Sequence, residues 1–388
     1  MNYKQLALAA ALLAGCSANI EDTSEQDLTE DVGSHVSSLI QNDDGHNLAA
    51  KFNVGKVHKK SHSFAKQKSC VKQPRRPEVG EGVPVEALEF ISRFTDDPTI
   101  FNISDVDENL QAPLFVDLWS EREGTRENGF DTGAHGLFGI FPPGFSAPIH
   151  THDADYHGVV LQGELTNPFG TELERFLDDP NADGDVVLRP GSYWFVPAGA
   201  QHSTTCRGPE VCWWYLSQTE TFRFLPLPAD TTAEDLVDDP ESIEIPVESL
   251  DFVYNNEVPF AFDNVFGSLL TGEHYSFGYV PAGQRVPRGL QGRSVAPDNF
   301  QYGLMVSGTL TNDFAGERGA PTRLDSGGFF TWPSGSVYET RCEGGRNGEG
   351  CLFYFHSDER FEFDSVCNKK QVRRNRRRRA QSRRRHRH

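Results

Sequence analysis

GFSAPIHTHDADYHGVVLQGEL (residues 144–165) and PGSYWFVPAGAQH (residues 190–202) are the two segments that decide the fold of this chain. Side chains on a β-strand alternate between its two faces. His150 and His152 are two residues apart, so both are expected to point into the same interior. The first segment therefore predicts a strand that presents a pair of imidazoles.

Two further histidines are expected to join this pair. The apolar residues Val-Val-Leu that follow His157 predict a short strand that would carry it inward, and a Pro-Ala-Gly turn after a run of aromatic β-formers would deliver His202 to the same place. Four neutral imidazoles that converge from two hairpins form a site for a first-row transition metal. The predicted metal ligands are His150, His152, His157 and His202.

The spacing of these residues resembles the two sequence motifs of the cupin superfamily: Gly144-x5-His150-x-His152-x4-His157-x5-Gly163 and Gly191-x5-Pro197-x-Gly199-x2-His202. The resemblance implies an all-β fold of double-stranded β-helix (jelly-roll) barrels, in which the two motifs lie on adjacent hairpins. The first motif departs from most cupins, which carry a glutamate ligand where this chain has His157 or, one residue earlier, Tyr156. The pattern is similar to a branch of two-barrel cupin lipoproteins with a His-x-His-x4-His first motif.

An internal repeat predicts a second barrel. HGLFGIFPPG (135–144) and YHGVVLQGELTNPF (156–169) return as HYSFGYVPAG (274–283) and QYGLMVSGTLTNDF (301–314). Strand-rich segments separated by Gly and Pro turns are typical of jelly rolls. We predict barrels at residues 81–240 and 241–367.

The second copy is predicted to have lost the metal. The register between the copies places Gly289, Gln291, Tyr302 and Tyr338 at the positions of His150, His152, His157 and His202. Two tyrosines and an amide leave a divalent ion without imidazole ligands, so the second barrel is expected to have a structural or substrate-shaping role.

The cysteines follow the repeat. Cys206 and Cys212 flank a Gly-containing turn after the second motif, and Cys342 and Cys351 match them in the second copy, so each pair is expected within disulfide reach across a hairpin. Of the six cysteines that remain after Cys16 is set aside, Cys70 and Cys367 are left to pair with each other. No CxxC spacing supports the alternative of a zinc–thiolate site. Paired cysteines suit an oxidising, extracytoplasmic compartment.

The start of the chain predicts export and anchoring. Residues 1–16 combine a basic residue, a short apolar run and Leu-Ala-Gly-Cys, which is typical of a signal peptide and resembles the bacterial lipobox. Cys16 would then be lipidated and hold the protein on a membrane; the alternative is a plain signal cut after Gly15. The absence of Asp after the cysteine favours an outer-membrane lipoprotein of the bacterial envelope, on its periplasmic or surface face. Residues 17–80 are polar and aperiodic, so they predict a disordered tether.

Charge is divided sharply along the chain. Residues 78–367 hold 48 acidic residues and 15 arginines, a formal −33, whereas residues 368–388 hold 12 basic residues and no acid. The acidic body argues against nucleic-acid binding by the barrels. The basic tail is expected to be disordered and either to bind an anionic surface or to fold back on the acidic body.

One smaller motif lies between the two cupin-like segments. Asp179-Pro-Asn-Ala-Asp-Gly-Asp185 resembles the first half of a calcium loop, but Pro190 falls where the closing glutamate would stand. Calcium binding and an ordinary acidic turn are the two interpretations.

The predicted site indicates two classes of function. A divalent ion held by neutral imidazoles keeps its full +2 charge, which favours small anions such as enolates and carboxylates. Zinc or iron(II) suits such ligands best, and manganese or nickel is also compatible. The first class is a metal-dependent enzyme (dioxygenase, lyase or isomerase) on a small anionic substrate. The second is a non-catalytic envelope module that binds a metal or a small ligand.

Overall fold

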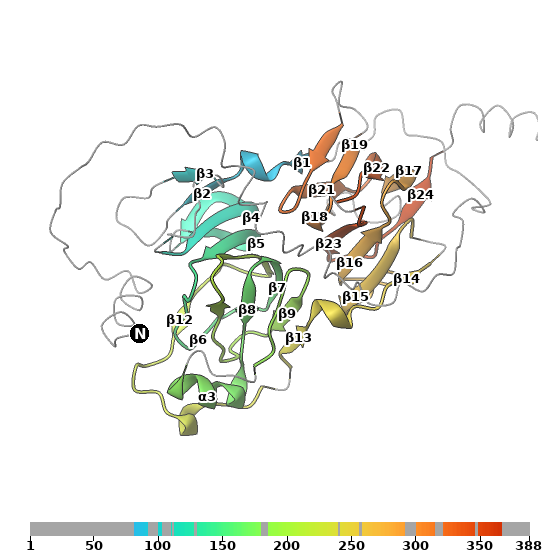
Figure 1. The fold of residues 1–388 in the computed structure, drawn as a ribbon. Helices are drawn as coiled ribbons and strands as arrows, with labels where there is room; N and C mark the ends of the chain where they lie inside the picture. Colours follow the sequence, from blue (N-terminus) through green and yellow to red (C-terminus); the bar gives the residue numbers. More distant parts are fainter. Residues whose placement is uncertain are drawn as a thin grey trace, which may run out of the picture. The chain divides into compact units, whose positions relative to one another are not determined.

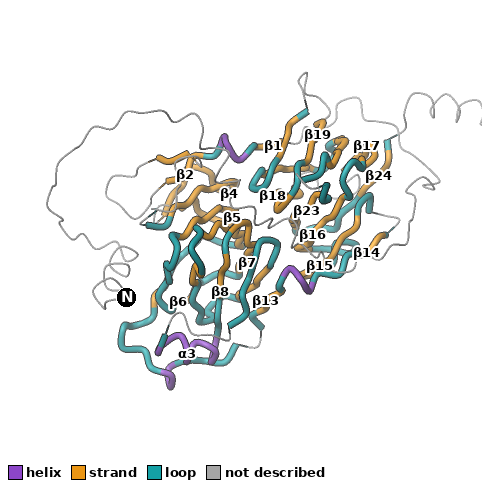
Figure 2. The backbone as a smooth tube through the Cα atoms, in the orientation of Figure 1, coloured by secondary structure: helices purple, strands orange, loops and turns teal. Residues whose placement is uncertain are grey.

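The computed structural model describes residues 81–91, 100–102, 110, 112–127, 130–179, 185–239, 241–255, 258–291, 300–314, 321–345 and 348–366. These residues form two compact units, one of residues 86–250 and one of residues 251–366 together with residues 81–85. Antiparallel strands and loops make up nearly all of both units (Figure 2). The predicted all-β fold of two jelly-roll barrels, the second one degenerate, is confirmed. No helix within the described residues combines the length and apolarity needed to cross a membrane.

The first barrel is built on an eight-stranded sheet and two small sheets (Figure 1). The large sheet runs in the order β13 (Ile243–Ile245), β9 (Tyr193–Val196), β7 (Tyr156–Gln162), β11 (Cys212–Gln218), β5 (Phe130–Phe141), β4 (Leu114–Glu127), β2 (Glu89–Ile91) and β3 (Ile100–Asn102). The small sheets pair β10 (Thr205–Arg207) with β8 (Glu164–Thr166) and β12 (Leu225–Pro226) with β6 (His150–Thr151). The helical turns are η5 (Gly170–Glu172), α3 (Leu173–Asp178), η6 (Ala233–Asp235) and η7 (Val247–Ser249).

The second barrel has a seven-stranded and a five-stranded sheet. The larger sheet runs β1 (Glu81–Val83), β21 (Phe329–Pro333), β18 (Phe300–Ser307), β23 (Cys351–Ser357), β16 (His274–Val280), β15 (Ala261–Gly267) and β14 (Val253–Tyr254). The smaller sheet runs β20 (Thr322–Leu324), β19 (Leu310–Phe314), β22 (Val337–Cys342), β17 (Arg285–Gln291) and β24 (Phe363–Ser365). The turn η3 (Val85–Ala87) follows β1.

Alternation along the central strands decides which residues face the interior of the first barrel. Tyr156 and Val160 of β7 and Trp214 and Leu216 of β11 belong to one buried apolar cluster, whereas the residues between them do not. Gly158, which lies between Tyr156 and Val160 on the same face, leaves room for an indole: a Cβ there would lie 2.0 Å from the Trp194 ring. The interior of this barrel is therefore lined by every second residue of these strands.

Each barrel is completed by the strand that precedes the other barrel in sequence. β13 pairs with β9 of the first barrel, and β1 pairs with β21 of the second. The same Pro-Val-Glu sequence follows both strands, at residues 84–86 and 246–248. The first compact unit therefore extends to Leu250, ten residues beyond the boundary predicted from the sequence, and residues 81–85 belong to the second unit.

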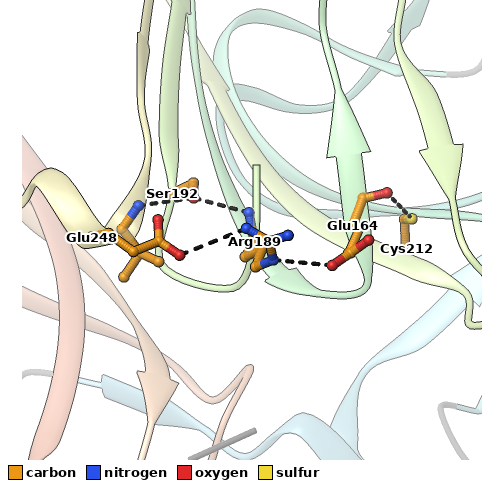
Figure 3. A network of polar contacts seen from close by, with 6 residues as sticks. Glu164, Arg189, Ser192, Cys212 and Glu248 are labelled. Atoms are coloured by element: carbon orange, nitrogen blue, oxygen red, sulfur yellow. Dashed lines mark hydrogen bonds and ion pairs between the residues drawn. The ribbon is translucent and has the colours of Figure 1, made fainter. Parts of the chain in front are cut away.

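Polar contacts hold the segment after β13 against the first barrel (Figure 3). The Ser192 hydroxyl accepts hydrogen bonds from the backbone N–H groups of Arg189, at 2.9 Å, and Val247, at 3.1 Å. The Arg189 guanidinium lies 3.0 Å from a Glu164 carboxylate oxygen and 3.7 Å from one of Glu248. These ion pairs are partly exposed and contribute little, so the buried Ser192 contact is the more important restraint.

Both short-range disulfides are present as predicted. Cys206 pairs with Cys212 and Cys342 with Cys351, with Cα atoms 5.5 and 5.7 Å apart. Each bond lies next to a glycine in the left-handed region, Gly163 or Gly308, where a Cβ would approach the sulfur of Cys212 or Cys351. The repeat in the sequence therefore corresponds to a repeat in the covalent frame.

Several predictions fall outside the described residues. These are the signal peptide (1–16) with Cys16, the tether (17–80), the basic tail (368–388) and the pairing of Cys70 with Cys367. Most of the calcium-loop candidate also lies outside them. Of its two described acidic ends, Asp185 forms an ion pair with Arg175 of α3 at 3.0 Å.

β1 completes the second barrel and β13 completes the first. Substitutions of the buried valines that follow these two strands are therefore expected to destabilise different barrels. Val85, with no exposed surface, packs with the second unit, and its counterpart Val247 packs with the first. Val85→Ala should lower the stability of the second barrel by about 1–3 kcal/mol, because it removes buried methyl groups beside β1. Hydrogen exchange followed by mass spectrometry should show faster exchange in β21 for Val85→Ala and in β9 for Val247→Ala. The reverse pattern would contradict the exchange.

Two buried histidines of the second barrel predict a loss of stability in acid. Burial lowers the pKa of His274 to about 4 and that of His356 to about 3. Above a pH of about 6.5 both residues are neutral in the folded and the unfolded chain, so pH has no effect through them. As the pH falls below about 6.5, these histidines bind protons in the unfolded chain but not in the folded barrel, so the free energy of unfolding decreases.

Urea unfolding of the chelator-treated protein at pH 7 and pH 5 tests this dependence. The wild type should lose more free energy of unfolding between the two values than His356→Gln does, by about 2 kcal/mol. An equal loss in both proteins would show that His356 does not carry the effect.

Candidate metal centre

Three of the four predicted ligands meet inside the first barrel. One ring nitrogen from each of His150, His152 and His202 lies within 4.8 Å of the others, and all three side chains are buried. His150 belongs to β6 and pairs across the barrel wall with His202, with backbone hydrogen bonds of 3.0 Å in both directions. The two cupin-like segments therefore meet at this backbone pair, and the three imidazoles converge beside it.

Backbone carbonyls orient all three rings. The Nδ1 atoms of His150, His152 and His202 lie 2.8, 2.6 and 3.1 Å from the carbonyl oxygens of Pro148, Arg223 and Ala200. Because a carbonyl can only accept, each Nδ1 carries the proton and each Nε2 keeps its lone pair for a metal. This arrangement prepares three nitrogen donors without any rotation of the rings.

Two nearby carboxylates support the site indirectly, through the backbone segments that hold the histidines. The Asp153 carboxylate pairs with the Arg223 guanidinium at 2.9 Å, and the Arg223 carbonyl in turn accepts from His152. Asp155 accepts from the backbone N–H of Ala198 at 2.7 Å, in the turn that precedes His202. Both carboxylates therefore position the backbone that holds the histidines.

Burial keeps the triad in its neutral, ligand-competent form. Burial, reinforced by the neighbouring imidazoles, holds the pKa values of His150 and His202 well below the ordinary value. Burial also lowers the pKa of His152 to about 4, against the opposing effect of the Arg223 carbonyl. The three rings are therefore free of protons at Nε2 near neutral pH.

The residues fit a metal ion. The Nε2 atom of His202 is buried and has no hydrogen-bond partner among the described residues. An unpaired buried acceptor costs free energy, and a metal bound to the three nitrogens would remove that cost. Neutral imidazoles with no carboxylate among them suit zinc, iron(II) and the neighbouring divalent ions.

His157, the fourth predicted ligand, lies elsewhere. Its Nδ1 is 2.7 Å from the Tyr193 hydroxyl, and its ring packs on Phe195. His157 is therefore on the face of β7 opposite to Tyr156, which belongs to the interior cluster. This placement corrects the expected four-histidine site to a three-histidine site.

Tyr156 lies where a fourth ligand was expected, but its ring forms part of the wall. The ring centroid is 5.0 Å from that of His152 and 5.4 Å from that of His202. The tyrosine pKa is raised by burial, while its hydroxyl interacts with Trp194 and Asn167 and lies near Glu244. Burial, together with Glu172 and Asp185, raises the Glu244 pKa to about 8. The hydroxyl is thus engaged in a buried polar group of side chains.

Two aromatic side chains that sequence reasoning missed cover the triad. The Phe224 ring stacks on His150 with centroids 4.2 Å apart, and the Phe222 ring packs on His152 at 4.7 Å. Both belong to the segment between β11 and β12, whose Arg223 carbonyl holds His152. In the sequence, the only sign of this role is that Phe222 and Phe224 are two residues apart, which indicates that both rings lie on the same side of the segment. They provide an apolar cover that limits water around the site.

In the second barrel, aromatic rings lie at the positions that correspond to the histidine triad of the first. Gly289 pairs with Tyr338 as His150 pairs with His202, which supports the register predicted between the copies. The Phe363 ring occupies the space where a side chain at position 289 would begin, 1.8 Å from the Cβ position. Tyr338 stacks on Trp332 with centroids 4.3 Å apart. Within the described part of the chain, the triad of the first barrel is the one histidine, cysteine or carboxylate cluster with metal-binding geometry.

Comparisons with known proteins agree with this architecture. The profile of a family described as "Domain of unknown function (DUF4437)" matches residues 117–364, which is more than half of the chain. No curated protein sequence matches. A putative dioxygenase from Nostoc punctiforme PCC 73102 has a similar structure, with a TM-score of 0.50, 14% identity, and coverage of 76% of this chain and 89% of that one.

Two further structures are more distant. Salicylate 1,2-dioxygenase of Pseudoaminobacter salicylatoxidans, in the form of a point mutant, has a TM-score of 0.41 and 14% identity, covering 64% of this chain and 80% of that one. Oxalate decarboxylase of Lactobacillus farciminis has a TM-score of 0.46 and 10% identity, covering 76% and 90%. At such identities the similarity concerns the fold alone.

Matched substitutions distinguish the triad from His157. His202→Ala should weaken metal binding by more than about 100-fold, because outer contacts of metal ligands alone account for 10- to 100-fold. His157→Ala should retain one metal per chain, because its ring contacts Tyr193 and Phe195 instead. Calorimetric titration with zinc and elemental analysis would measure both. Metal loss in His157→Ala, with the fold intact by circular dichroism, would restore the four-histidine site.

Proposed function

The chain belongs to the DUF4437 family, and we propose that it is a metal-dependent enzyme that acts on a small anionic molecule. The observation that carries this proposal is the set of three buried imidazoles, each with Nδ1 fixed by a carbonyl and with one ring nitrogen within 4.8 Å of those of the other two. Three protein ligands leave coordination positions open for a substrate, as is typical of catalytic rather than structural metal sites.

His150, His152 and His202 would hold the ion, and the ion would supply a +2 charge that polarises a bound substrate oxygen. Among the residues that the structure describes, no carboxylate joins the triad, so none of the triad's ligands would cancel this charge. A chelating anion, such as a 2-oxo acid or an enolised dicarbonyl compound, is the substrate class that such a centre attracts most strongly.

The surrounding residues favour chemistry in a dry site. Phe222 and Phe224 pack on two of the ligand rings, and Tyr156 closes the wall on another side. Exclusion of water strengthens the attraction between the metal and a substrate anion. With iron(II) the site would support a dioxygenase reaction, and with zinc it would support Lewis-acid chemistry of a lyase or isomerase.

We also propose that the protein works in the bacterial cell envelope, attached to the outer membrane through Cys16. The two disulfides of the barrels support an oxidising compartment. The basic residues 368–388 would then lie near anionic groups of the envelope or on the acidic body.

Metal content and chelator binding test the proposed activity together. Protein purified from its native compartment should hold about one iron, manganese or zinc ion per chain. The metal-loaded protein should bind pyruvate at least about tenfold more tightly than propionate, which cannot chelate through a 2-oxo group, and His202→Ala should lose this difference.

Two results would change the assignment. Zinc as the sole metal would exclude the dioxygenase reaction. Tight metal binding without any preference for chelating anions, and without turnover of 2-oxo acids or dicarbonyl compounds, would favour the non-catalytic binding module.

A further inference from the structure

A histidine–glutamine pair lies on the interior wall of the first barrel, outside the triad. His135 of β5 and Gln218 of β11 are directly opposite each other in the sheet, and their side chains are 0% and 3% exposed. The Gln218 Nε2 lies 2.9 Å from the His135 Nε2. Such a pair needs a specific arrangement of protons, because both nitrogens cannot donate to each other.

The contacts of His135 determine which way the glutamine amide points. The His135 Nδ1 lies 2.9 Å from the carbonyl oxygen of Gly133, so Nδ1 carries the proton and Nε2 is an acceptor. The Gln218 side chain must therefore turn its NH2 group toward His135. Its carbonyl oxygen, Oε1, points away from this pair, and it is buried without a hydrogen-bond partner among the described residues.

Strand register places the Gln218 side chain on the interior face of the barrel, next to a residue that packs on the triad. Gln218 pairs with His135 on one side and with Tyr156 of β7 on the other, so the three residues form a row across the sheet. Gln218 shares its face of β11 with Leu216 and Trp214, which belong to the interior cluster. Tyr156, its neighbour in the row, packs against His152 and His202.

The segment that covers the triad also begins at this pair. The chain leaves Gln218 and reaches Phe222 and Phe224, which pack on the ligand rings. On the way, the Thr221 hydroxyl accepts from the backbone N–H of Gly133 at 2.9 Å, which ties the segment to the residue that orients His135. The glutamine and the metal ligands are therefore parts of one lining.

We propose that Gln218 Oε1 accepts a hydrogen bond from a hydroxyl group of the substrate, which selects chelating anions that carry a hydroxyl beyond the two metal-binding oxygens. The inference rests on the proposed function and narrows its substrate class to hydroxylated 2-oxo acids and related chelators. A buried acceptor that stays unpaired costs free energy, so a ligand that supplies the donor binds better than one that lacks it. Sites that hydrogen-bond a substrate hydroxyl discriminate strongly against analogues without it.

The second barrel provides a control glutamine, at the repeat position of Tyr156. His274 and Gln301 form a buried pair there, with the His274 Nε2 and the Gln301 Oε1 3.1 Å apart, in a barrel that has Gly289 and Tyr338 where the first barrel has His150 and His202. Loss of the Gln301 side chain removes a buried contact with a histidine outside the first barrel and leaves the triad untouched. A role in substrate selection is confined to Gln218.

Calorimetric titration of the metal-loaded full chain tests the proposal with two pairs of probes. These are pyruvate against 3-hydroxypyruvate, and phenylpyruvate against 4-hydroxyphenylpyruvate, which place the hydroxyl at a short and a long distance from the chelating oxygens. The wild type should bind the hydroxylated member of at least one pair about 5- to 50-fold more tightly. Gln218→Leu should lose this preference while it binds the unhydroxylated member within about twofold of the wild type. Gln301→Leu should keep the preference.

The outcomes separate this inference from the proposed function. Binding of the chelators with no preference in the wild type, or with a preference that survives in Gln218→Leu, would overturn the role of Gln218 and leave the metal enzyme intact. Failure of all four probes to bind the metal-loaded protein would overturn both. If Gln218→Leu does not fold or does not hold one metal per chain, Gln218→Met, which keeps the length of the side chain, takes its place with the same expected results.

Discussion

The hydrogen bonds from three imidazole N–H groups to three backbone carbonyls are the interaction on which the site depends. The carbonyls belong to Pro148, Arg223 and Ala200, which lie in three separate turns or loops. Each of these segments is held by its own contacts, including the Asp153–Arg223 ion pair and the bond from Ala198 to Asp155. The orientation of the three imidazoles is thus set by the backbone of these segments.

The two barrels show how one backbone supports different interiors. The pairing of His150 with His202 is reproduced by the pairing of Gly289 with Tyr338, and the disulfides and their neighbouring glycines also correspond. In the second barrel the Phe363 ring and the stacked Trp332 and Tyr338 fill the volume that the imidazoles occupy in the first. At this position the second barrel therefore has an apolar aromatic interior instead of a group of imidazoles.

Much of this could be predicted from the sequence, because the signals are local. The two-residue spacing of His150 and His152, the repeat and the cysteine pairs indicated the barrels, the triad and the disulfides. The assignment of His157 failed because residues 152–155 leave the strand, so that counting faces from His152 does not carry over to β7. The roles of Phe222, Phe224 and Gln218, and the partners of β1 and β13, depend on contacts between distant segments, for which periodicity contains no information.

The exchange of β1 and β13 also determines the order in which the chain can fold. Residues 86–250 contain every strand of the first barrel, so that barrel can form as soon as β13 has been synthesised or exported. β1, the first described strand, must wait for β21, since Glu81 pairs with Thr331, 250 positions later. Closing so long a loop is slow, and the edge of β21 stays open until it happens. The first strand of the folded body is therefore among the last to pair, and the edge of the larger sheet in the second barrel is closed by residues made long before the rest of that sheet.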